Sequence, residues 1–281
     1  FKQKTAYEIR PRDWSSDVCS SDLRSAANAL ALGGWLLWRQ GGAGLWRAVR
    51  EGGGLLWASA ACWTVMFTSF MLAMTLTTVA NVLVTMSLAP LVTALISRLW
   101  LRHRLPARTW AAIVLAGVGI AWMYGSQMVA GSPRDLLGTL VALTVPLAGG
   151  TMWTLLQHNA QAHPEDHRDM TPAVLLGSIV SALLTMPPAW PLQASGHDIG
   201  LLVMLGVVQL AIPCVLAVAA GRVLKAPEAS LLGLLEILFG VAWAWLGTSE
   251  QPTAAVVGGG ALVLIALAGN EAIALRQRAA S

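Results

Sequence analysis

The chain has 281 residues, of which 56% are hydrophobic and only 11% are charged, and its mean hydropathy is +0.63. A soluble domain carries about 25% charged residues, and a chain of this length has no interior large enough to hide so much apolar surface. The composition therefore excludes an ordinary soluble protein, and the modest net charge of +4, concentrated in short loops, suits membrane orientation better than nucleic-acid binding.

The first 23 residues differ from the rest, because they hold eight of the 32 Lys, Arg, Asp and Glu residues. Two contiguous blocks, from Lys2 to Ile9 and from Asp13 to Leu23, resemble the translated product of sequencing-library adapters. The segment has no apolar centre, so it does not resemble a signal peptide. We therefore expect residues 1–23 to be non-native and the natural N-terminus to be missing.

Apolar stretches of about 20 residues, the length that crosses a bilayer as a helix, follow one another along the remaining chain. A shorter one runs from Arg24 to Arg39. Residues 52–97 contain no Asp, Glu, Lys or Arg, which predicts two helices with a tight turn near Thr75–Val79. Six further spans are predicted, within residues 109–133, 136–164, 170–197, 199–221, 229–249 and 251–270. The sequence thus predicts an all-α polytopic membrane protein with nine spans.

Basic residues in the connections predict the orientation of these spans. With the C-terminus in the cytoplasm, twelve Lys and Arg residues lie at inner span ends, whereas two, Arg24 and Arg134, lie at outer ends. The positive-inside rule therefore favours a cytoplasmic C-terminus.

The span pattern repeats when the chain is shifted by 147 residues. Four pairs of segments match: the run that starts at Arg24 matches the run that starts at Thr171, and residues 54–76 match 201–223. The helix of Pro90 matches the helix of Glu236, and residues 109–125 match 256–272. Five spans per unit is an odd number, so the second unit is inverted relative to the first, as in many secondary transporters. The helix at 135–157 has no partner, so we expect a ten-helix natural protein. Its units here are residues 24–125, lacking a first helix, and 135–275.

Two segments carry a family resemblance: TTVANVLVTMSLAP, ending at Pro90, and APEASLLGLLE, ending at Glu236. With the expected repeat, they make residues 24–275 similar to the EamA-type transporters of the drug/metabolite transporter superfamily. The family pattern has a Leu-x-Pro or Glu-Pro step in each fourth helix and an acid about thirteen positions later. Ile237 departs from the second step, Glu250 keeps the second acid, and His103 replaces the first.

That resemblance implies export or exchange of small metabolites, such as amino acids, across a bacterial inner membrane by a multi-pass protein that is not an enzyme. We expect a small-molecule substrate, the lipid bilayer as surroundings, and protons as a candidate coupling ion. No cofactor and no nucleic-acid partner are expected, and the oligomeric state stays open.

Glu236 is the leading candidate residue, because it lies near the middle of an uncharged run between Glu228 and Glu250. An ionised carboxyl at that depth costs several kcal/mol and usually marks a substrate or proton pathway. Glu236 could couple protons or hold a substrate amine; alternatively, it is neutral and serves helix packing. Gln209, in mid-span, could orient a polar ligand or join two helices.

Trp153 could stack on a ligand, and Asn81 lies one turn into its helix near the outer face. Three prolines within spans could act as gating hinges or as static bends: Pro90, Pro146 and Pro213. His158 and the His163 to His167 segment have no fixed ligand spacing, so no metal site is expected.

We interpret the chain as a secondary transporter, an exporter that works by alternating access around a central cavity. One alternative is a polytopic membrane enzyme acting on lipid-linked substrates, but no catalytic motif or converging set of catalytic groups is present in the sequence. The other is a scaffold or sensor that transports nothing, which predicts that Glu236 and Gln209 are both sealed in helix contacts.

Overall fold

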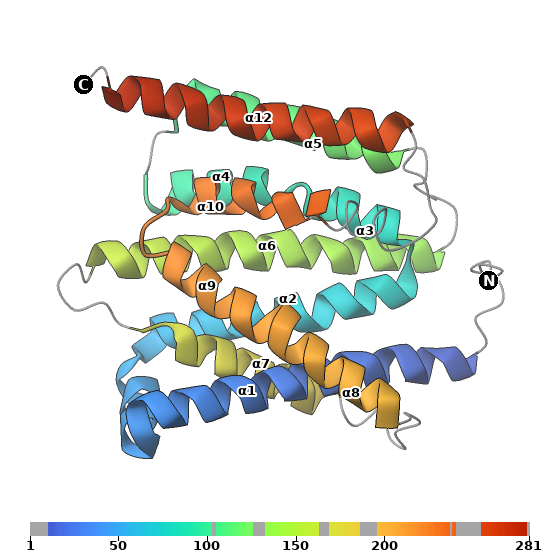
Figure 1. Ribbon diagram of the computed structural model, residues 1–281, viewed down its shortest axis with the longest axis vertical. Helices are drawn as coiled ribbons and strands as arrows, with labels where there is room; N and C mark the ends of the chain where they lie inside the picture. The colour runs from blue at the N-terminus through green and yellow to red at the C-terminus, as the bar shows by residue number, and fades with distance from the viewer. Residues whose placement is uncertain are drawn as a thin grey trace.

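The computed structural model describes residues 11–102, 105–125, 133–162, 169–185, 196–236, 238–239 and 254–279, and its regular elements are helices. The bounds are α1 Pro11–Glu51, α2 Gly53–Leu76, α3 Val79–Met86, α4 Ala89–Trp100, α5 Ala107–Tyr124, α6 Pro133–Ala162, α7 Thr171–Thr185, α8 Gly196–Leu205, the π-helix η3 Gly206–Ala211, α9 Ile212–Ala220, α10 Ala226–Gly233 and α12 Ala254–Ala279. Most run nearly parallel, stacked from α12 and α5 to α1 and α7, while α9 crosses them obliquely (Figure 1).

Membrane-crossing helices are prominent in the described part of the chain. Four are long and apolar enough to cross a bilayer by length and composition: Gly53–Leu76, Asn81–Trp100, Pro133–Ala162 and Ile199–Ala220. Three shorter apolar helices are Ala107–Met123, Thr171–Thr185 and Ala254–Asn270. The expected all-helical membrane fold and the tight turn between α2 and α3 are confirmed, while the count of nine spans stays a prediction.

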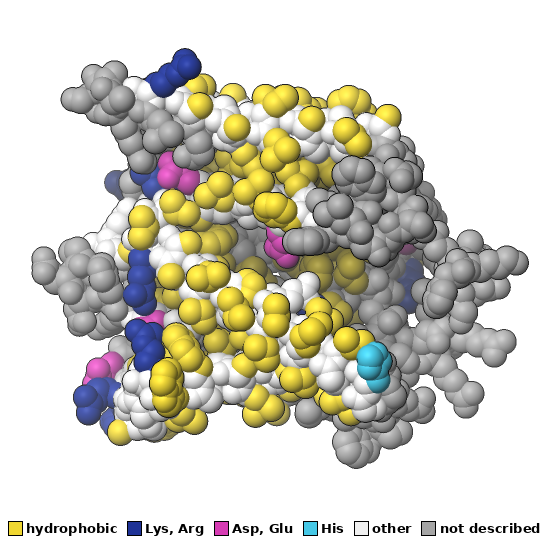
Figure 2. Space-filling model, in the orientation of Figure 1, with side chains coloured by type: hydrophobic (Ala, Val, Ile, Leu, Met, Phe, Trp, Pro, Cys, Tyr) yellow, Lys and Arg dark blue, Asp and Glu magenta, His cyan; other side chains and the backbone are white. Residues whose placement is uncertain are grey.

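The exterior is apolar, as a surface facing lipid should be. Leu30, Leu99 and Val223 are among the large hydrophobic side chains that are more than three-quarters exposed. Figure 2 shows hydrophobic side chains over most of one face, with Lys and Arg side chains gathered toward one end of the helices. An apolar belt bounded by basic residues is the distribution that a bilayer selects.

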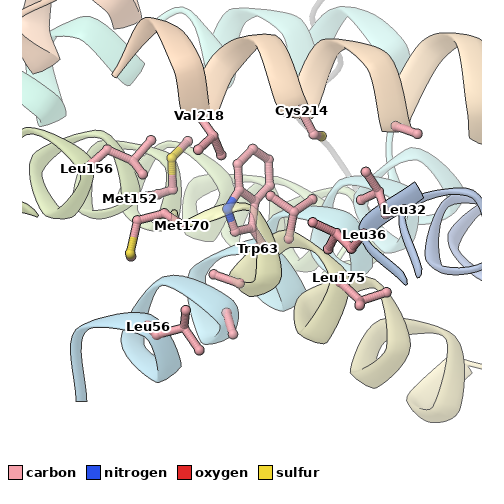
Figure 3. Packing of buried hydrophobic residues seen from close by; sticks show 14 of the residues in the cluster. Leu32, Leu36, Leu56, Trp63, Met152, Leu156, Met170, Leu175, Cys214 and Val218 are labelled. Carbon is pink, nitrogen blue, oxygen red and sulfur yellow. The ribbon is translucent and has the colours of Figure 1, made fainter. Parts of the chain in front are cut away.

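The largest buried cluster centres on Trp63 of α2, which is only 3% exposed. Leu36 of α1, Met152 of α6 and Val218 of α9 surround its indole (Figure 3). Because lipid is as apolar as these side chains, their packing stabilises the bundle through close dispersion contacts rather than through removal from water.

Glycines allow two pairs of helix backbones to approach closely. A Cβ atom on Gly119 of α5 would lie 2.7 Å from the carbonyl oxygen of Gly259 in α12. A Cβ atom on Gly206 of η3 would lie 2.6 Å from the carbonyl oxygen of Arg24 in α1. Small residues at such crossings are typical of helix pairs within membranes. The second contact fixes α1 against the π-helix, which matters for the site described below.

Helix boundaries recur along the chain at the predicted interval. The eight-residue helices α3 and α10 begin at Val79 and Ala226, and α5 and α12 begin at Ala107 and Ala254, so both starts differ by 147 positions. Each short helix ends in a turn, at Ser87–Leu88 and at Leu234. Two pairs of helices matched by this interval also contact each other: α1 with α7, and α5 with α12.

Candidate functional site

The site begins with an irregular helix that carries Gln209. Residues Gly206–Ala211 form a π-helix between α8 and α9, and the Ile212 N–H donates to the carbonyl of Val207, five residues earlier. Pro213 follows in the first turn of α9. Its ring has no N–H and collides with the carbonyl four residues earlier, which belongs to Gln209. The proline thus accounts for the wider turn, and π-helical turns of this kind are frequent at functional sites.

Arg24 of α1 reaches this π-helix. Its Nη1 donates to Oε1 of Gln209 at 3.4 Å, while its Nε is buried and has no hydrogen-bond partner. We expected Arg24 at the outer end of a span, but it lies thirteen residues after α1 begins at Pro11. Sequence reasoning missed Arg24 as a site residue because an arginine at the start of an apolar run is read as a loop charge.

Glu236 completes the group of polar side chains. It follows the turn at Leu234 by two residues, and its side chain is exposed, as is that of Gln209. The charges of Arg24 and Glu236 are near enough to influence each other. Figure 2 shows an acidic side chain at the edge of a hollow near the centre of the face, at a level between α10 and α9. Arg24 and Gln209 therefore meet from two separate helices, and the charge of Arg24 also influences Glu236.

These groups lie deep along the helices rather than at their ends. The basic end of the bundle is marked by Arg39 and Arg222, which both bind one carboxylate. At about 1.5 Å per residue, Arg24 lies about 22 Å along α1 from Arg39, and Gln209 about 20 Å from Arg222. Glu236 lies about 16 Å beyond Lys225, which precedes α10. In a hydrocarbon layer of about 30 Å, all three positions are far from water at that end.

A polar seam extends from Arg24 along the contact between α1 and α7. Nδ2 of Asn28 donates to Oγ of Ser178 at 2.8 Å, and the Oδ1 atom of Asn28 is buried without a partner. The hydroxyls of Ser25 and Thr68 lie 3.5 and 3.0 Å from that of Ser181. Hydrogen bonds between membrane helices are worth about 1 kcal/mol each, so this seam joins α1, α2 and α7 without requiring a large cavity.

The remaining predicted site residues lie elsewhere. Trp153 of α6 packs against the cluster around Trp63, and the structure does not bring it to Arg24. Asn81 is 2% exposed at the start of α3, where its Nδ2 donates to Oγ1 of Thr77 at 2.8 Å. Thr77 in turn lies 3.5 Å from Asp135 of α6, so Asn81 belongs to a network at the end of the bundle away from Arg39.

The three prolines occupy different settings. Pro90 lies in the first turn of α4, directly after the turn that separates α3 from α4. Pro213 follows the π-helix, whereas Pro146 lies inside α6, which continues through it without interruption. Two of the three therefore coincide with a change of backbone geometry. Several residues of the family pattern or of the expected loops lie outside the described residues: His103, Ile237, Glu250 and 163–168.

Asp169 forms a second polar cluster at the basic end of the bundle. Its carboxylate is bound by Arg39 at 3.4 Å, by Gln40 at 3.2 Å and by Arg222 at 3.2 Å. The same carboxylate accepts from the backbone N–H and the hydroxyl of Thr171, at 3.0 and 2.6 Å. One side chain thus joins the part of α1 just before its non-helical residue Gly41, the start of α7 and the turn after α9.

Comparison with known proteins agrees with this architecture. The sequence model of the EamA-like transporter family matches residues 18–125. Among curated proteins, none matches the chain. A solved structure described only as "Crystal structure of protein" is similar, with a TM-score of 0.74 and 14% sequence identity over 97% of this chain and 91% of that chain. At this identity the likeness shows the fold alone.

Proposed function

Because residues 18–125 form a domain of the EamA-like transporter family, we propose that this chain is a secondary transporter that exports small metabolites by alternating access. The family and the helices already indicate a multi-pass membrane protein of the drug/metabolite transporter type with a small-molecule substrate. The proposal adds the location of the site, the inverted repeat, the exporting direction and a bacterial inner membrane with the C-terminus in the cytoplasm.

The observation that carries the proposal is the correspondence between two halves of the chain. The breaks after α3 and α10 fall at equivalent positions, and equivalent helices contact each other in two pairs, α1 with α7 and α5 with α12. The contact of α2 with α7 also has a counterpart in the contact of α1 with α8 and η3. A pseudo-twofold axis between inverted units would produce this pattern, and discontinuous helices at equivalent positions are typical of transporter binding sites.

The polar groups support a site between these halves. Arg24 belongs to the first unit, whereas Gln209 and Glu236 belong to the second. A scaffold without transport predicts that Gln209 and Glu236 are sealed in helix contacts, but both are exposed and face the charge of Arg24. Motion of one unit against the other would change the spacing of these groups, which couples ligand contact to the direction in which the site opens.

The proposed movement uses the backbone irregularities and the cluster at the basic end. The turns after α3 and α10, and the π-helix before Pro213, are the places where a helix can bend without breaking a regular ladder. Asp169 joins the first unit through Arg39 to the second unit through Arg222. We assign Asp169 the role of holding the basic end of the bundle closed while the hollow is open toward the opposite end.

Flux measurements test the proposal. The 281-residue chain is reconstituted in liposomes loaded with a mixture of small metabolites, and their release is followed by mass spectrometry with and without a pH gradient. We expect release of a subset of compounds above protein-free liposomes, and a loss of stimulation by the gradient in Glu236→Gln.

Two outcomes would overturn separate parts of the proposal. If no compound is released faster than from protein-free liposomes, the transporter assignment is wrong. If Glu236→Gln and the unchanged chain give equal flux under both conditions, the coupling role of Glu236 is wrong while transport stands. Glu51→Gln, which removes an exposed carboxylate at the end of α1, serves as the matched control and should leave the flux unchanged.

A further inference from the structure

A polar cavity lies at the basic end of the bundle, between the last turns of α6 and the turn that joins α9 to α10 (Figure 1). Its volume is about 180 Å³, and its polar lining comes from Gln157, Gln161, Arg222 and Lys225. Since one water takes about 30 Å³ in the liquid, the space holds a small polyatomic group together with a few waters. Arg24 does not line it, so the cavity is separate from the site described above.

Gln157 of α6 carries a donor toward which no protein group is directed. The side chain is 5% exposed, and its Oε1 accepts a 2.9 Å hydrogen bond from the backbone N–H of Ala226, the first residue of α10. Because that N–H can only donate, the amide must turn its oxygen to Ala226, which leaves Nε2 as a donor. Among the residues that the structure describes, Nε2 has no hydrogen-bond partner. An acceptor inside the cavity would satisfy this donor.

The turn between α9 and α10 is held firmly against α6. A Cβ atom on Gly221 would lie 2.8 Å from the Cβ of Leu156, so the backbone of the turn packs directly on that helix. The start of α10 itself adds few donors, because the Ala226 N–H is used by Gln157 and Pro227 has no N–H. The cavity therefore depends on side chains that a fixed turn presents, rather than on a helix end.

Two cations at the cavity keep part of their binding capacity unused. Nη2 of Arg222 donates to Asp169 at 3.2 Å, and the other N–H groups of this guanidinium have no partner in the described part of the chain. Lys225 is exposed and forms no ion pair with any described residue. The carboxylate of Asp169 is already shared with Arg39. Positive charge is in excess here even when Glu228 of α10, which does not line the cavity, is counted.

The neighbouring side chains place this cavity at the level of lipid headgroups. Val223, between the two cations in sequence, is 85% exposed, which puts an apolar side chain against the surrounding lipid. Trp100, at the end of α4, is half exposed and stacks on His158 of α6 with ring centroids 6.4 Å apart. Tryptophan at the end of a span is typical of the membrane–water interface. Basic pockets between helices at this level suit the phosphate groups of anionic lipids.

We propose that this cavity binds a phosphoryl group that is supplied by the headgroup of an anionic phospholipid. Arg222 and Lys225 pair with the phosphoryl oxygens, Nε2 of Gln157 donates to one of them, and Val223 borders the acyl chains. Because Arg222 also binds Asp169, an occupied site stabilises the turn between α9 and α10 together with the contact between the two units. The inference is independent of what the chain transports.

Native mass spectrometry of the 281-residue chain, purified in a neutral detergent, tests the inference by counting bound lipids. Dioleoyl phosphatidylglycerol and dioleoyl phosphatidylcholine are titrated separately, so that only the headgroup differs. Glycerol phosphate, added without lipid, offers the same phosphoryl chemistry in soluble form. The variants are Arg222→Gln, Lys225→Gln and the control Arg276→Gln. Arg276 of α12 is exposed and does not line the cavity, so its loss changes the net charge equally.

The unchanged chain should bind one phosphatidylglycerol about tenfold or more tightly than phosphatidylcholine. Arg222→Gln and Lys225→Gln should each weaken this binding about tenfold, the value of one hydrogen bond to a charged group, whereas Arg276→Gln should change it by less than about twofold. Equal weakening in all three variants would indicate a diffuse surface attraction and overturns the site. Lack of preference for phosphatidylglycerol, or equally tight binding of glycerol phosphate, overturns the assignment to an anionic lipid.

A variant at Gln157 keeps the test valid if Arg222→Gln, which also breaks the pair with Asp169, does not fold. Gln157→Glu retains an acceptor for the Ala226 N–H but replaces Nε2 with an oxygen, so it should fold and lose the preference for phosphatidylglycerol. Thermal unfolding provides the second readout: phosphatidylglycerol should raise the Tm of the unchanged chain and of Arg276→Gln, but not that of Gln157→Glu. An equal rise in Gln157→Glu overturns the inference.

Discussion

Asp169 offers the sharpest test of how the ends of the two units are joined, because two substitutions separate its contributions. Asp169→Ala removes the acceptor for the Thr171 N–H and hydroxyl and also the partner of Arg39 and Arg222. Asp169→Asn removes the charge but keeps an oxygen that can accept from Thr171. The difference between the variants therefore reports the hydrogen bonds at the start of α7, and the Asn variant alone reports the ion pairs.

The expected magnitudes follow from exposure. The side chains of Arg39 and Arg222 are 51% and 35% exposed, so solvent screens both pairs and each contributes about 0.5 kcal/mol. Hydrogen bonds that satisfy the first turn of a helix contribute about 1 kcal/mol. We expect a loss of about 1 kcal/mol for Asp169→Asn and about 2 kcal/mol for Asp169→Ala. In thermal terms these are shifts of about 2–4 °C and 4–8 °C.

Thermal unfolding in detergent, followed by tryptophan fluorescence at low and at 1 M salt, measures both shifts. Salt should reduce the effect of Asp169→Asn, because the Debye length falls to about 3 Å at 1 M, and should leave the difference between the two variants unchanged. Equal shifts for Asn and Ala would show that the α7 hydrogen bonds contribute nothing. A salt-independent shift in Asp169→Asn would show that the ion pairs are not its cause.

Two further predictions concern backbone geometry. Gly259→Leu should lower the free energy of unfolding by about 1–3 kcal/mol, because the new side chain would strike the carbonyl of Gly119. The control is Gly269→Leu in the same helix. No atom lies within 4 Å of a Cβ atom placed on Gly269, so this variant should have little effect in the same thermal assay. Pro213→Ala should fold but transport more slowly, because a regular α-helix would turn Gln209 away from Arg24. A flux equal to that of the unchanged chain would contradict this prediction. Pro146→Ala, in the uninterrupted helix α6, is the control.

The arrangement along the chain could be predicted from sequence because it depends on composition alone. An uncharged run must be long enough to cross the hydrocarbon layer, and residues 52–97 are long enough to cross it twice, which is why the turn between Leu76 and Val79 was found. The interval of 147 residues was also found from hydropathy and recurs in the starts of α3 and α10.

The site could be predicted only in part, because rotation about a helix axis is invisible when a helix is apolar all round. Glu236 and Gln209 were identified as the polar residues in apolar runs; a hydrogen bond joins Gln209 to Arg24, while the role of Glu236 stays a prediction. Trp153 was expected to stack on a ligand, yet it packs against the cluster around Trp63. Arg24 could not be found, because its role depends on the π-helix, which changes the direction of Gln209, and on the missing side chain of Gly206.

The irregular backbone and the polar side chains explain each other. Within hydrocarbon, a segment that departs from α-helical hydrogen bonding is tolerated only where it lines a cavity or is buried in protein. Two departures, the π-helix and the turn at Leu234, each carry or adjoin a polar residue, Gln209 and Glu236, and the charge of Arg24 acts at the same place. If lipid filled this space, the exposed carboxylate and the freed carbonyl would both lack partners. The proposed wet hollow between the two units would provide those partners, so the backbone geometry and the charges favour the same location for a ligand.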